Sequence, residues 1–91
     1  MSVTIKSIAP QGTTPVYSGF TIFGVTSEAG QNVQVYYEIL QNGVQSANLR
    51  AVSDNHGCWS VSFPGDFKVG TEVTAYARNG SAELAWLTRA F

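Results

Sequence analysis

The stretch DNHGCWSVSF, residues 54–63, combines a turn with a strand and indicates the fold of the whole chain. From Trp59 to Phe63, apolar residues alternate with serines, which is the period of two shown by a half-buried β-strand. Before this strand, Gly57 allows the positive φ of a tight turn, and the Asp54 carboxylate can accept hydrogen bonds from turn amides. The stretch therefore predicts a turn followed by a strand that carries Trp59 on its inward face.

The same alternation recurs along the rest of the chain, and no stretch has a convincing helical period. Seven short strands are predicted, within residues 3–8, 19–26, 32–40, 44–53, 58–63, 71–78 and 83–91. Turn residues, among them Pro64-Gly65-Asp66, separate these strands at a spacing of roughly 8–12 residues, which is typical of an antiparallel sandwich. Because a single sheet of seven strands would leave an apolar face in water, we expect two packed sheets.

Length and composition predict one domain that covers residues 1–91. Hydrophobic residues make up 44% of the chain, enough to fill a core, and the single cysteine cannot form an intrachain disulfide. Charged residues make up only 12%, about half the roughly 25% that is usual. The five Lys and Arg residues are scattered, which argues against nucleic-acid binding, and no apolar run is long enough for a membrane-spanning helix.

The first ten residues, MSVTIKSIAP, lack the charged and then apolar pattern of a secretion leader. Two interpretations of this stay open. The chain is either a whole protein that is made and used without secretion, or one module cut from a longer secreted protein. The single cysteine suits assembly in a reducing compartment.

Residues 18–38 (SGFTIFGVTSEAGQNVQVYYE) and 54–80 (DNHGCWSVSFPGDFKVGTEVTAYARNG) resemble the bacterial immunoglobulin-like modules of large adhesins and phage structural proteins. The positions that match are Gly24, Gly30, Asp54, Gly57, Trp59, Gly70, Val73 and Ala75. The chain differs from antibody-type domains because it has no paired cysteines and its tryptophan is not on the third strand. The resemblance covers about residues 3–89 and implies an immunoglobulin-like antiparallel β-sandwich, a fold that serves many functions.

Candidate catalytic or metal-binding residues are sparse. His56 and Cys58 flank a turn glycine, but a transition-metal site needs three or four ligands and there is no second His or Cys. A nucleophile needs a base that is itself held by a third group. Asp54 with Asp66 or Glu28 is a candidate for calcium, with turn-capping as the alternative, since calcium takes six to eight oxygens. We therefore expect no enzymatic activity, no bound metal and no cofactor.

A contact surface is expected on the outward face of one sheet. If residues 32–40, 71–78 and 83–91 share a sheet, as the resemblance implies, that face carries aromatic and apolar side chains, which favours binding to a partner. The predicted contact residues are Tyr36, Leu40, Tyr76, Leu87 and Phe91, with Trp86 as the alternative to Leu87. Tyr17 and Phe67, in loop-like stretches, are weaker candidates. The alternative is the ordinary scatter of apolar residues over a protein surface.

These features predict a non-enzymatic structural or interaction module. The favoured hypothesis is a decoration or other structural protein of a phage virion, made in the host cytoplasm and bound in many copies to capsid or tail subunits. The alternative is an excised immunoglobulin-like module of a bacterial surface adhesin, which would act beside neighbouring modules as a stalk or bind a host glycan. A carbohydrate-binding module also stays open, because sugars bind to exposed aromatic faces.

Overall fold

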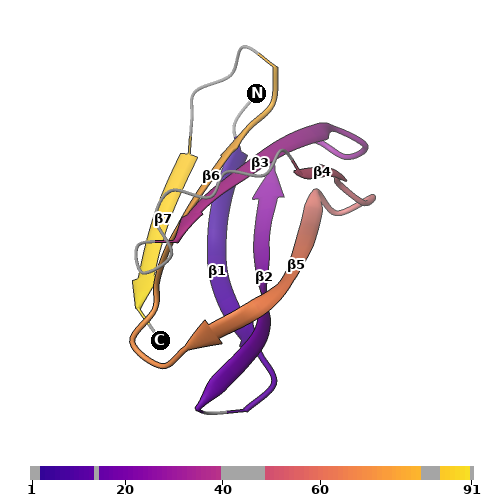
Figure 1. Ribbon diagram of the computed structural model, residues 1–91. Helices are drawn as coiled ribbons and strands as arrows, with labels where there is room; N and C mark the ends of the chain where they lie inside the picture. The colour runs from indigo at the N-terminus through magenta and orange to yellow at the C-terminus, as the bar shows by residue number, and fades with distance from the viewer. Residues whose placement is uncertain (1–2, 14, 40–48, 81–84, 91) are drawn as a thin grey trace.

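A computed structural model describes residues 3–13, 15–39, 49–80 and 85–90, which form seven β-strands and no helix. The strands are β1 (Val3–Gln11), β2 (Val16–Thr26), β3 (Asn32–Ile39), β4 (Leu49–Val52), β5 (Cys58–Lys68), β6 (Glu72–Arg78) and β7 (Ala85–Ala90). Antiparallel pairing arranges them in two packed sheets, with orders β1-β2-β5 and β4-β3-β6-β7 (Figure 1). The predicted all-β, immunoglobulin-like sandwich without a disulfide is confirmed. The described ranges contain no helix that could span a membrane.

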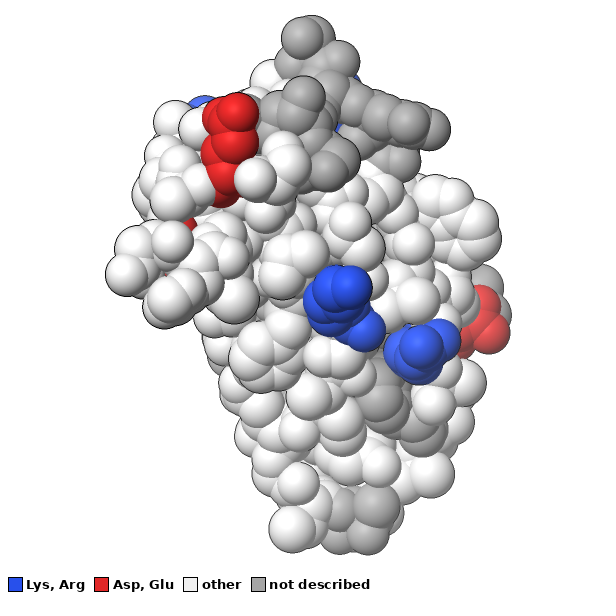
Figure 2. All heavy atoms as spheres, turned by 180° about the vertical axis from the view of Figure 1, so that it is seen from behind, with Lys and Arg blue, Asp and Glu red and all other residues white. Residues whose placement is uncertain are grey.

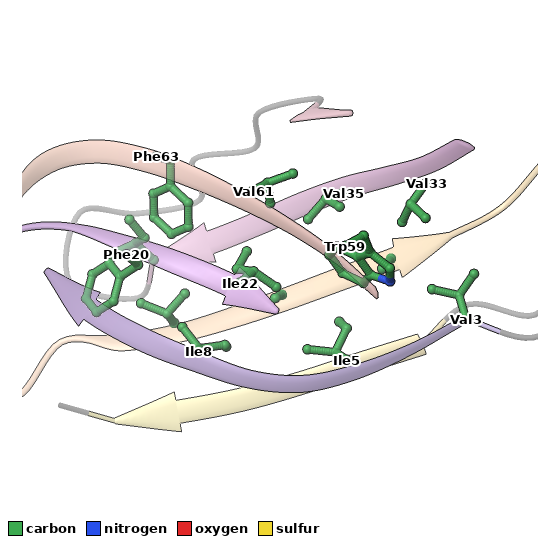
Figure 3. Packing of buried hydrophobic residues seen from close by; sticks show 14 of the residues in the cluster. Val3, Ile5, Ile8, Phe20, Ile22, Val33, Val35, Trp59, Val61 and Phe63 are labelled. Carbon is green, nitrogen blue, oxygen red and sulfur yellow. The ribbon is translucent and has the colours of Figure 1, made fainter. Parts of the chain in front are cut away.

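Alternate residues of both sheets point inward and form one hydrophobic core (Figure 3). Its buried members are Val3, Ile5, Ile8, Phe20, Ile22, Val33, Val35, Ile39, Trp59, Val61, Phe63, Phe67, Val73, Ala75 and Ala77. Only 4% of the surface of Trp59 is exposed. Its indole ring closes over Gly24, which pairs with it in β2, and a Cβ at Gly24 would lie 2.2 Å from Cζ2 of the ring. A residue without a side chain is therefore required at Gly24 by the space that the ring occupies.

Part of the core is an aromatic cluster that joins the two sheets. The ring centroids of Phe20 and Phe63 lie 5.6 Å apart, and those of Phe20 and Phe67 lie 4.9 Å apart. From the opposite sheet, Tyr37 stacks on Phe63 with a centroid distance of 3.9 Å and an interplanar angle of 8°. Ring contacts of this kind add to the free energy gained by burying apolar area, so the cluster helps to hold β3 against β5.

The prediction of a turn at Pro64-Gly65-Asp66 is wrong, because these residues continue β5. Proline has no backbone N–H to donate, but β5 is an edge strand of its sheet, where one side of the backbone needs no partner. Pro64 pairs with Gly19, next to an irregularity in the register of β2. Phe67 is consequently buried in the core and is no contact residue, and Tyr17 lies in β2 and packs against the core rather than in a loop.

The turn before β5 has the geometry that its residues predict. Oδ1 of Asp54 accepts hydrogen bonds from the backbone N–H of Cys58, at 2.9 Å, and of His56, at 2.8 Å. Gly57 has a φ of 80°, in the left-handed region that glycine tolerates best. The two backbone hydrogen bonds hold the pKa of Asp54 below its usual value, because they stabilise the ionised carboxylate.

The lowered pKa of Asp54 predicts a loss of stability in acid. Because the pKa is lower in the folded chain than in the unfolded one, where it is about 3.9, the contribution is fully present above pH ~5 and is lost as the pH falls through the folded-state value. We expect the urea midpoint to fall between pH 6 and pH 3 by less in Asp54→Ala than in wild type. Glu72→Ala, which removes an exposed carboxyl outside the turn, is the control. Equal acid-induced losses in Asp54→Ala and wild type would contradict this role.

Candidate functional site

Three aromatic side chains form a row across the outer face of the four-stranded sheet. Tyr36 of β3 pairs with Tyr76 of β6, which in turn pairs with Trp86 of β7. Residues paired across antiparallel strands point to the same face. Their neighbours Val35 and Ala77 are fully buried, so the row points outward. We refer to Tyr36, Tyr76 and Trp86 as the aromatic row.

The aromatic row is accessible to a partner. Trp86 has 67% of its surface exposed, the largest value among the exposed large hydrophobic residues of the described chain, and Tyr36 and Tyr76 are half-buried. An indole ring that is exposed to water does not gain the free energy that burial of its apolar surface would provide. Covering the ring with a partner would therefore be favourable. The aromatic row is therefore a candidate contact surface.

The prediction of Leu87 as an outward contact residue is wrong. Leu87 pairs with Ala75 on the inner face and packs against the core, and Trp86 takes the outward position. The reason is that β7 is apolar in both phases, so alternation alone does not fix its orientation, whereas the register with β6 does. Of the other predicted contact residues, Tyr36 and Tyr76 share the outer face, and Leu40 and Phe91 lie outside the described residues.

Two further rows run parallel to the aromatic row on the same face. On one side, Gln34 of β3 pairs with Arg50 of β4 and Arg78 of β6, and these three residues form what we call the basic row. Both arginines are exposed. Sequence reasoning missed this row, because its two arginines come from separate strands that only the pairing with β3 brings together.

On the other side of the aromatic row, Glu38 of β3 pairs with Thr74 of β6, which pairs with Thr88 of β7. The hydroxyl groups of Thr74 and Thr88 share a hydrogen bond of 2.8 Å. We call this set the acidic row, since Glu38 is its one charged member. The face thus changes from basic through aromatic to acidic along the strand direction.

A shallow groove of about 570 Å³ adjoins the basic row. Its lining includes Arg50, Gln34, Asn32 and Asn79, and the side-chain amide of Asn79 donates a hydrogen bond to the carbonyl oxygen of Asn32. The groove extends the polar end of the same face. Aromatic and polar groups that a partner could contact are therefore continuous over this sheet.

His56, in the turn, and Cys58, at the start of β5, do not form a site with other chemistry-bearing groups of the described residues. Both are exposed, and Cys58 is a free thiol on β5. Among the residues whose placement is described, no group of three or more His, Cys, Asp or Glu side chains could hold a metal ion. The role that the structure gives to Asp54 is to accept hydrogen bonds from the backbone of its own turn.

Charged side chains are few on the face shown in Figure 2, where most of the surface consists of uncharged residues. Comparisons of the chain with protein-family models, with curated proteins and with solved structures found no match. What this domain binds must therefore be inferred from the chemistry of its own surface.

Proposed function

We propose that this chain is a non-enzymatic interaction module that binds protein subunits through its aromatic row, as a decoration or other structural protein of a phage virion. The observation that carries the proposal is the outward row of Tyr36, Tyr76 and Trp86. The alternative residues for a site are His56, in the turn, and Cys58, the first residue of β5, and among the described residues they belong to no group of three or more side chains that could hold a metal ion. The module would act by attachment and would catalyse no reaction.

The composition of the outer face supports a protein partner. Aromatic residues and arginine are enriched at the centres of protein interfaces, where charged groups other than arginine are depleted. The aromatic row lies between two arginines on one side and one carboxylate on the other, so its centre is free of charge. Such a centre can be desolvated at little electrostatic cost when a partner covers it.

The setting in a virion is supported by the sandwich and by the sparse charge of the surface. A chain with only 12% charged residues relies on neutral polar groups for solubility, and the resemblance to phage immunoglobulin-like modules points to the same setting. In a symmetric particle, many identical weak contacts add up through multivalency. A modest interface for each copy is then sufficient for stable attachment.

The positions of the start of β1 and the end of β7 favour a second candidate, an immunoglobulin-like module of a bacterial surface adhesin. β1 begins and β7 ends toward opposite ends of the sandwich (Figure 1), and the domain is 38 Å long. Modules with this layout can be joined head to tail into a stalk. The length of the native reading frame decides between the two, because an adhesin module requires further modules on the same polypeptide.

The proposed contact predicts a selective effect of Trp86→Ala. Co-sedimentation with phage particles that lack this protein should weaken about thirtyfold or more, as for removal of a central aromatic anchor. The unfolding free energy should change by less than about 1 kcal/mol, because the side chain is largely exposed. The matched control is Phe23→Ala, which removes an aromatic ring with 41% exposure from β2 in the other sheet.

Two results are required if the aromatic row is the contact surface. Wild-type protein must co-sediment with the particles, and Phe23→Ala must bind as the wild type does. If Trp86→Ala binds as well as wild type, the aromatic row is not the contact surface. If wild type never co-sediments with any particle of the phage, the virion role is excluded.

A further inference from the structure

We infer that the outer face of the four-stranded sheet pairs with the same face of a second copy of this chain, about a two-fold axis that runs along the aromatic row. This inference names a second copy of the chain as an occupant of that face, and it rests on the proposal that the aromatic row is a contact surface. Because the dimer and the attachment to a particle use the same face, one copy makes only one of these contacts at a time. A contact of this kind is isologous, so every interaction that one copy makes is returned by the other. The observation behind it is the order of the three rows on the face.

Charges of opposite sign lie at equal separations from the aromatic row. The basic row lies two residues along the strands on one side, and the acidic row lies two residues along on the other. Two residues of a strand span about 7 Å, so Gln34 and Glu38 are separated by about 13 Å. The carboxylate of Glu38 therefore lies far from Arg50 and Arg78 of its own chain. Within the described ranges, neither arginine takes part in an ion pair.

A rotation of 180° about the aromatic row exchanges the two sides. It places Glu38 of the second copy opposite Gln34 of the first, since both residues lie on β3 at equal separations from the axis. Arg50 and Arg78 flank Gln34 on the neighbouring strands β4 and β6, each about 4.8 Å to one side. The carboxylate then lies between two guanidinium groups, whose N–H donors match carboxylate oxygens.

The same rotation places each member of the aromatic row opposite its own counterpart. Tyr76 faces Tyr76 of the second copy at the centre, with Tyr36 and Trp86 on either side. Two sheets pack face to face at about 10 Å, a distance that side chains of this size fill. The exposed indole of Trp86 is thereby covered by Trp86 of the second copy, and this contact requires neither a cleft nor a change in the backbone. Glu72, which lies beyond the acidic row on β6, adds a further negative charge to that side.

Sedimentation velocity over a range of concentrations tests the pairing. Wild-type protein should form a dimer of twice the 9.8 kDa chain mass, and high salt should weaken it. Glu38→Arg alone, and the double variant Arg50→Glu/Arg78→Glu alone, should each raise the dimer Kd at least about tenfold, because like charges then face each other twice. An equimolar mixture of the two variants should form a mixed dimer, since both contacts are attractive again. Lys6→Glu/Lys68→Glu, on β1 and β5 of the other sheet, matches the double change in charge.

The outcomes separate this inference from the proposed function. Any of three results overturns the pairing. The first is a wild-type chain that stays monomeric at about 1 mM. The others are charge-reversed variants that dimerise as wild type does, and a mixture of these variants that forms no mixed dimer. Far-UV circular dichroism of each variant establishes that it is folded. A monomer that still co-sediments with virions through Trp86 leaves the proposed function standing and removes the dimer. A dimer that never co-sediments with virions leaves the pairing standing and removes the proposed virion role.

Discussion

A Trp59→Ala variant is expected to lose about 3–5 kcal/mol of unfolding free energy, a large part of the roughly 5–15 kcal/mol that stabilises a small domain. The side chain is 4% exposed and lies between the two sheets. Its removal leaves a cavity that the rigid strands on either side cannot close, so the cost of lost contacts adds to the cost of lost burial. We expect a variant that is partly unfolded at 37 °C.

Urea unfolding followed by far-UV circular dichroism measures this loss, because the signal does not depend on the tryptophan that is removed. Trp59→Phe is the informative control. The indole Nε1 is buried and has no hydrogen-bond partner among the described residues, so phenylalanine loses volume but no hydrogen bond. We expect it to cost only about 1–2 kcal/mol. A Trp59→Ala chain as stable as wild type would show that the ring at this position does not hold the sheets together.

Gly24→Ala is expected to destabilise the domain by about 3 kcal/mol or more. The added Cβ would lie 2.2 Å from Cζ2 of Trp59 and 2.3 Å from the backbone oxygen of Thr4. The second contact is with the main chain of β1, so a new side-chain rotamer cannot relieve it. The sheet pairing between β1 and β2 or the position of the indole must shift instead.

The contrast with Gly30→Ala isolates the cause. Gly30 has a φ of +69°, and no atom lies within 4 Å of the place that a Cβ would take, so alanine there meets only the strain of the backbone conformation, about 1–2 kcal/mol. Thermal and urea unfolding of both variants should rank Gly24→Ala as the less stable. The reverse ranking would mean that β1 and the indole can move apart at small cost.

The strands with a regular alternation were predictable, and the reason is physical. In β3 and β6 one phase is entirely apolar, because that face packs against the opposite sheet, so periodicity alone identifies the inward residues. In β5 the same pattern predicted the buried position of Trp59. The extension of β5 through Pro64 was not predictable, because the effect of a proline depends on whether its strand lies at a sheet edge, which is a property of the strand order.

The candidate site was predictable in part. Tyr36 and Tyr76 could each be placed on an outward face, since each belongs to a strand with a clear inward phase, and the resemblance implied that the two strands share a sheet. The orientation of Trp86 and Leu87 required the register between β6 and β7, which is set by pairing and is invisible in a strand that is apolar on both sides. Predicting the basic row required both the register between β3 and β4 and the register between β3 and β6, because Arg50 and Arg78 are brought together only by their pairing with β3.

The single thiol allows a fluorophore to be attached at one defined position, so that association of the protein can be measured. Cys58 is exposed on β5 and its neighbour Trp59 points inward, so the sulfur lies on the outer surface of the three-stranded sheet, on the opposite side of the sandwich from Trp86. A maleimide fluorophore attached there would leave the aromatic side chains uncovered. Energy transfer between two labelled molecules would then report their association and its lifetime without any engineered cysteine.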